Sequence, residues 1–115
     1  MVDRLFVYSP LIEEVLAEFA NHDALAKQIE DEILKNPEAG DIVQGTGGIR
    51  KMRLADPGRN KGKRGGLRVF FLDLPDKERT HLIFLLRKGD ADDISPDEKQ
   101  VLKELVVRIK KESSK

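Results

Sequence analysis

The stretch LRVFFLDLPDKERTHLIFLL, residues 67–86, contains two apolar segments separated by a short polar turn. Residues 67–74 and 80–86 are apolar at both alternating sets of positions, which is typical of central strands covered on both faces of a sheet. The turn residues Pro-Asp-Lys-Glu at 75–78 join them as an antiparallel hairpin. The chain is therefore expected to fold around a small sheet.

A further strand, residues 49–54 (IRKMRL), precedes this hairpin. Alternation places Lys51 and Arg53 on one face of the strand, while Arg50 takes the other face. Arg68 begins the next strand, so we expect Lys51, Arg53 and Arg68 to converge on one exposed surface of the sheet. Converging cations of this kind suit the binding of phosphate groups.

The charge distribution strengthens this expectation. The 115 residues include 21 basic and 21 acidic side chains, so the formal net charge is zero. Residues 1–44 nevertheless carry a net charge of −7, and residues 45–72 carry +7. Such a local surplus is an electrostatic footprint for an anionic partner, although a solvated basic loop is the simpler alternative. Four cations lie in the glycine-rich segment 55–66, where they are expected to overhang the sheet: Arg59, Lys61, Lys63 and Arg64.

The first third of the chain predicts a strand and two helices. Residues 3–8 form a short apolar run that reads as a strand. The Ser-Pro pair at 9–10 then begins a helix whose apolar stripe extends to Phe19. Asp23 is positioned to cap a second helix, which ends at the Asn-Pro pair at 36–37 because the residue before a proline avoids helical geometry.

The last helix begins at Ser-Pro-Asp-Glu, residues 95–98, which form a capping box. Its apolar stripe extends to Ile109, and residues 110–115 are expected to fray. The resulting order is β-α-α-β-β-β-α. We therefore predict a single α+β domain over residues 1–115, with a small, mostly antiparallel sheet packed on an N-terminal helical hairpin and a C-terminal helix.

Composition excludes several classes of function. The chain has no cysteine and only two histidines, His22 and His81, so disulfides and thiolate metal sites are absent and a multi-histidine site is not expected. No apolar run approaches a membrane span, and no secretory signal is visible. The sequence predicts a soluble, cytoplasmic domain without metal, cofactor or membrane partner. His81 lies in an apolar strand and is expected to be packed rather than catalytic.

Three ordered blocks of sequence carry a resemblance to a known family. GTGGIRKMR (45–53) is followed by the basic loop and by GGLRVFF (65–71), and LLRKGDADDISPDEKQVLKEL (85–105) comes later. Together with the preceding NPEAGDIV, they cover about residues 36–106. This pattern resembles the HigB-like branch of the RelE/ParE superfamily of type II toxin–antitoxin toxins, including its phage-derived Gp49-like members. The predicted order of elements is also that of the superfamily.

The resemblance implies a toxin that inhibits translation. Relatives of this kind enter the ribosome and cleave mRNA without a metal, by attack of a ribose 2′-OH on the adjacent phosphate. Such chemistry needs a base, cations for the charge that builds on phosphate oxygens, and an acid. By motif position, Lys51 is the candidate base, Arg53 and Arg68 are phosphate clamps, and Lys88 stabilises the transition state or donates a proton. The resemblance also implies contacts to RNA from further cations: Arg50, Arg59, Lys61, Lys63 and Arg64.

The family implies partners, and it leaves alternatives open. The expected partners are a cognate antitoxin, of the helix-turn-helix kind, and the ribosome with its mRNA. One alternative is a ParE-like inhibitor that binds DNA gyrase and cleaves nothing. Another is a nucleic-acid-binding module or a decayed toxin, since Leu86 stands where many relatives carry a tyrosine or histidine.

Overall fold

The computed structural model describes residues 4–55, 66–87 and 94–113, which build a five-stranded sheet and three α-helices. This confirms the predicted α+β class. In chain order the elements are β1 (Leu5–Tyr8), α1 (Pro10–Leu16), α2 (His22–Lys35), β2 (Asp41–Ile42), β3 (Arg50–Leu54), β4 (Leu67–Leu74), the short 3-10 helix η2 (Pro75–Lys77), β5 (Arg79–Arg87) and α3 (Pro96–Ser113).

The strand order is β1-β5-β4-β3-β2, with β1 parallel to β5 and the other three pairs antiparallel. The sheet is thus mostly antiparallel, as predicted. It has one strand more than predicted, because Asp41 and Ile42 pair with Lys51 and Arg50. A strand of two residues is too short to show an alternating pattern in the sequence, so the pattern does not predict it. The guanidinium of Arg50 also supports it, since Nη1 donates to the carbonyls of Glu38 and Gly40 at 2.9 and 3.2 Å.

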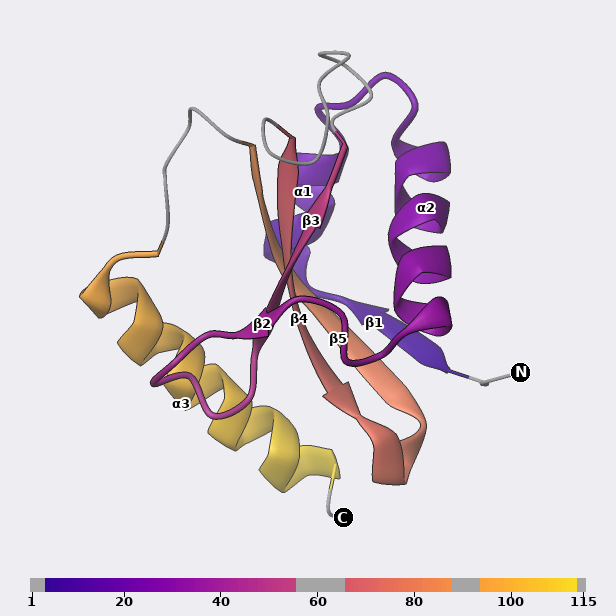
Figure 1. Cartoon of the computed structure of the whole chain (residues 1–115). Helices are drawn as coiled ribbons and strands as arrows, with labels where there is room; N and C mark the ends of the chain where they lie inside the picture. The colour runs from indigo at the N-terminus through magenta and orange to yellow at the C-terminus, as the bar shows by residue number, and fades with distance from the viewer. Residues whose placement is uncertain (1–3, 56–65, 88–93, 114–115) are drawn as a thin grey trace.

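The helices cover both faces of the sheet, with α1 and α2 on one face and α3 on the other (Figure 1). Each face has its own apolar cluster. Alternation along β4 sends Phe71 into the α1/α2 cluster and Phe70 into the α3 cluster, and both side chains are fully buried. The prediction that β4 and β5 are covered on both faces is confirmed.

The boundary between the first two helices differs from the prediction. Helix α1 ends at Leu16, and Phe19 becomes buried through a tight turn in which its N–H donates to the Leu16 carbonyl. Asn21 is the N-cap of α2, so the predicted cap, Asp23, lies in the first turn instead. A carboxylate there still complements the helix dipole, which is why the two positions are hard to distinguish in a sequence.

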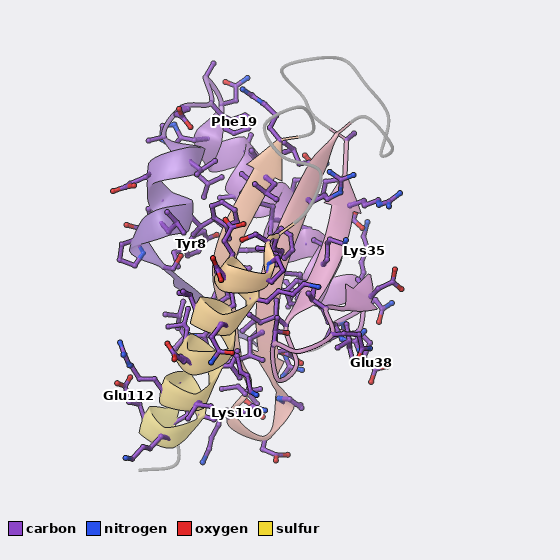
Figure 2. All side chains as sticks on the ribbon, turned by 90° about the vertical axis from the view of Figure 1, so that its left-hand side faces the viewer. Tyr8, Phe19, Lys35, Glu38, Lys110 and Glu112 are labelled. Carbon is purple, nitrogen blue, oxygen red and sulfur yellow. The ribbon has the colours of Figure 1, made fainter. Side chains whose placement is uncertain are left out.

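The end of α3 is also longer than predicted, because the helix continues to Ser113 instead of fraying after Ile109. Lys110 Nζ donates to the Gly47 carbonyl at 3.0 Å, and Arg79 Nη1 lies 3.4 Å from Ser113 Oγ. Lys110 and Glu112 project from opposite sides of the helix (Figure 2). These contacts with the sheet and the β2–β3 loop stabilise a segment whose composition alone indicates a polar tail.

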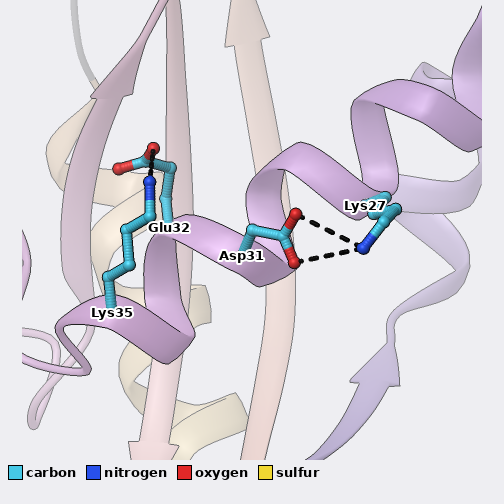
Figure 3. Close-up of polar contacts among 4 residues, drawn as sticks. All are labelled: Lys27, Asp31, Glu32 and Lys35. Atoms are coloured by element: carbon cyan, nitrogen blue, oxygen red, sulfur yellow. Dashed lines mark hydrogen bonds and ion pairs between the residues drawn. The ribbon is translucent and has the colours of Figure 1, made fainter.

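The N-terminal third of the chain forms two kinds of ion pair, one buried and one exposed. Arg4 and Asp73 form a buried pair in which Nε lies 3.1 Å from Oδ1 and Nη2 donates to Oδ2 at 3.2 Å. On the exposed side of α2, Lys27 pairs with Asp31 and Lys35 with Glu32, each at 3.4 Å (Figure 3). Surface pairs of this kind contribute little to stability, whereas the buried pair joins the start of the chain to β4.

None of the helices within the described residues is both long and apolar enough to cross a lipid bilayer.

Candidate nucleic-acid interface

Two arginines and a lysine share the α3 face of the sheet. Arg53 on β3 and Arg68 on β4 are directly paired in the strand register. Lys51 is two positions before Arg53, so it projects from the same face. The structure thus brings together the three cations that the sequence places on one surface.

The three side chains differ in exposure. Arg53 is exposed, whereas Lys51 and Arg68 are half-buried. Within the described part of the chain, neither arginine forms an ion pair with a carboxylate. Nη1 of Arg68 is buried and has no hydrogen-bond acceptor among those residues. A buried donor without an acceptor costs free energy, and an anionic oxygen placed there would recover it.

Apolar side chains lie beside the three cations on this face of the sheet. Arg68 is paired with Leu86 of β5, and the neighbouring row is Lys51, Phe70 and Phe84. The two phenylalanine rings lie 6.1 Å apart, inclined at 33°. Apolar surroundings lower the local dielectric constant, which strengthens the attraction between these cations and a phosphate. Leu86 contributes no acid or base to the row of Arg53 and Arg68.

The β2–β3 hairpin fixes the position of Lys51. Gly40 has a φ of +78°, and a Cβ at this position would lie 2.1 Å from the Lys51 carbonyl oxygen. Only glycine allows the chain to pass this close to β3. Arg50, predicted to contact RNA, projects from the opposite face, and its Nη1 binds the two carbonyls before β2. The structure therefore does not bring Arg50 together with the other three cations.

The glycine-rich segment 45–48 before β3 has a packing role. Thr46 is fully buried; its hydroxyl donates to the Val43 carbonyl at 2.7 Å and accepts from the Ile49 N–H at 3.2 Å. Gly47, with a φ of +85°, lies against α3, where a Cβ would be 3.3 Å from Val106 Cγ1. The motif that carries part of the family resemblance thus docks the hairpin onto the last helix.

Two other titratable side chains lie apart from this site. His81 is half-buried on β5, and its Nε2 has no hydrogen-bond partner within the described residues. Burial lowers the pKa of His81, and nearby Arg79 lowers it further. Arg87, on the α1/α2 side, has its guanidinium carbon 4.1 Å from the centre of the Phe19 ring, in a cation–π contact.

The remaining predicted site residues lie outside the described residues: Lys88, Arg59, Lys61, Lys63 and Arg64. In contrast, the prediction overlooked Lys110 on α3, whose Nζ donates to the Gly47 carbonyl of the β2–β3 loop. Lys99 and Lys103 are eleven and seven residues before it, a spacing that places all three lysines on one stripe of a helix.

No protein-family model matches the chain. Among solved structures, the fold is similar to that of the isolated E. coli RelE toxin. The TM-score is 0.54, and the alignment covers 89% of this chain and 98% of the RelE chain. This chain has a RelE-like fold. Sequence identity with RelE is 13%, so the similarity concerns the arrangement of the sheet and helices and does not transfer residue roles.

Proposed function

We propose that this chain is the toxin of a type II toxin–antitoxin system, of the HigB-like branch with its phage-derived Gp49-like members. Its activity would be ribosome-dependent, metal-independent cleavage of mRNA, which blocks translation. The RelE-like fold supports the toxin class. The observation that carries the nuclease activity is the direct pairing of Arg53 with Arg68, whose buried Nη1 has no acceptor in the described part of the chain.

In this proposal the ribose 2′-OH attacks the adjacent phosphorus, a cyclic phosphate forms, and the 5′-oxygen leaves with a proton. Arg53 and Arg68 bind the non-bridging oxygens, where negative charge increases in the transition state. Lys51, on the same face, would act as the base that accepts the proton of the 2′-OH. Lys88 would stabilise the charge on the leaving 5′-oxygen or donate a proton to it. Two guanidinium groups are well suited to this task because each presents several N–H donors in a fixed plane.

Ribosomal RNA would be bound by the loop cations, which are Arg59, Lys61, Lys63 and Arg64. Arg50 would join them if its hydrogen bonds to the two carbonyls break on binding. The cognate antitoxin, of the helix-turn-helix kind, is the proposed protein partner. This activity would require the chain to act in the cytoplasm, where ribosomes translate.

The proposal is tested by mapping mRNA 5′ ends in translating bacteria after brief induction of the protein. We expect new ends at consistent positions within codons for the wild type, and their loss in the double variant Arg53→Gln/Arg68→Gln. The matched control Lys27→Gln/Lys35→Gln removes two charges from α2 and should leave the cuts unchanged. Growth arrest with intact messages would contradict the nuclease and favour the gyrase-inhibitor alternative.

A further inference from the structure

Helix α3 turns one side toward the β2–β3 hairpin, and the contacts identify that side. Lys110 Nζ donates to the Gly47 carbonyl, and Val106 packs against the same glycine. Lys103 and Lys99 are seven and eleven residues before Lys110. At 3.6 residues per turn, each projects within about 20° of the direction of Lys110. All three lysines therefore line the hairpin side of α3.

The first turns of α3 lie beside the row of the sheet that contains Lys51. Glu98, Val101 and Leu102 line a shallow apolar hollow together with Phe84. Phe84 is in the same row as Phe70 and Lys51, which are its successive neighbours across β4 and β3. Two strand spacings, about 10 Å, separate the backbones of Phe84 and Lys51.

Val101 is about 160° around the helix from Lys99 and about 200° from Lys103. Because Val101 lines the hollow with Phe84 of β5, these two lysines project from the side of the first turns that faces away from that hollow, in the direction of β3. In Figure 2, Lys110 lies on the side of α3 that faces β3, and Glu112 lies on the opposite side of the helix.

Lys99 and Lys103 are not neutralised within the described part of their own helix. The acidic residues Glu98 and Glu104 project about 100° away from it, on either side. Lys99 is half-buried, Lys103 is exposed, and neither forms an ion pair within residues 4–55, 66–87 and 94–113. Like charges at i and i+4 weaken a helix slightly, so this pair does not contribute to the stability of α3 and both ammonium groups remain suited to an anionic ligand.

We propose that Lys99 and Lys103 form a second basic wall, beside the one that Lys51, Arg53 and Arg68 form on the sheet, and bind backbone phosphates of a single RNA strand next to the phosphate assigned to Arg53 and Arg68. This inference rests on the proposed function and extends it. The sheet provides the reacting cations, and α3 fixes the register of the strand on them. Contacts from lysines to phosphates are independent of base sequence, so this wall adds affinity and position rather than codon preference.

The test measures binding of a short, fluorescently labelled, single-stranded RNA whose 2′-O-methyl groups prevent cleavage. Anisotropy titrations of the purified full-length protein between about 50 and 200 mM salt give the dependence of affinity on salt. Each lost phosphate contact reduces the magnitude of the slope of log K against log salt by about 0.7. For Lys99→Gln/Lys103→Gln we expect a reduction of about 1.4. The matched control, Arg108→Gln/Lys111→Gln, removes two charges of α3 that project about 160° and 100° from the direction of Lys110, and it should change the slope little.

A slope in the Lys99/Lys103 variant equal to that of the wild type would overturn the inference. So would an equal loss in the control, or a wild type that binds the RNA without salt dependence. Failure of the proposed function is separate, because it shows in the mRNA 5′ ends. If messages are cleaved but the slope of the Lys99/Lys103 variant equals that of the wild type, only the proposed role of these two lysines is refuted. If messages stay intact but the slope changes as expected, the role of the two lysines is supported and the nuclease activity is refuted.

Discussion

Arg53 and Arg68 lie directly opposite each other on β3 and β4, and in the described structure neither is paired with a carboxylate. Like charges at directly opposed positions of an antiparallel pair destabilise it. The stability of the sheet therefore does not explain this arrangement, whereas the proposed binding of one phosphate by both arginines would. Removing one of the two charges should therefore make the folded protein more stable.

We accordingly expect Arg53→Thr to raise the free energy of unfolding by about 0.2–1 kcal/mol, since threonine also favours a strand. Urea denaturation of the purified protein measures this change. Arg53→Lys keeps the charge and should give no such gain. A loss of more than about 1 kcal/mol in the threonine variant would show that the Arg53 side chain supports the fold.

Gly40 and Gly45 provide a matched pair of substitutions, because both have a positive φ, +78° and +82°. Alanine at either position carries the cost of left-handed backbone, about 1–2 kcal/mol. At Gly40 its Cβ also meets the Lys51 carbonyl at 2.1 Å, whereas at Gly45 nothing lies within 4 Å. Gly40→Ala should therefore cost about 1–3 kcal/mol more than Gly45→Ala in urea denaturation. Equal losses would mean that the hairpin shifts away from β3 without strain.

Much of this fold is readable in the sequence because its central strands have strong local signals. The apolar residues on both faces of β4 and β5 predict a covered sheet, and alternation alone places Lys51 and Arg53 together on β3. The direct pairing of Arg53 with Arg68 depends in addition on the register of β3 and β4, which the structure supplies. The sequence therefore contains the described part of the candidate site in nearly complete form.

What the sequence did not predict depends on contacts between distant residues. Strand β2 is two residues long and depends on Arg50 and on the close approach of Gly40. The last turn of α3 is polar, yet it persists because Lys110 reaches Gly47 across 63 positions of sequence. The direction of the α3 lysines likewise depends on this docking, so their spacing predicts a stripe but not which part of the sheet it faces.

The buried pair of Arg4 and Asp73 should dominate the electrostatic contribution to stability. The two side chains are 8% and 12% exposed, and Thr80 donates a further hydrogen bond of 2.7 Å to the Asp73 carboxylate. Asp73→Ala leaves the guanidinium uncompensated and should cost about 3–5 kcal/mol. Glu32→Gln, which breaks an exposed pair on α2, should cost no more than about 0.5 kcal/mol. Thermal denaturation followed by circular dichroism distinguishes the two, and similar losses would contradict this ranking.

His81 should make the fold sensitive to mild acid. Burial and the adjacent Arg79 lower the pKa of His81 below its ordinary value of 6.5, and Glu112 opposes them only in part. The folded state therefore binds this proton less readily than the unfolded state. The corresponding stability is present above pH 6.5 and decreases as the pH falls below it toward the lower folded pKa.

Urea denaturation at pH 7.5 and at pH 5.5 should accordingly show a smaller loss of stability in His81→Gln than in the wild type. His22→Gln is the control, because the His22 side chain is 54% exposed, and this variant should retain the wild-type loss. Apart from these substitutions the three proteins are identical, so the difference between them isolates the contribution of His81. An identical loss in His81→Gln and the wild type would mean that the imidazole is protonated in the folded state without cost, with its buried Nε2 able to find an acceptor.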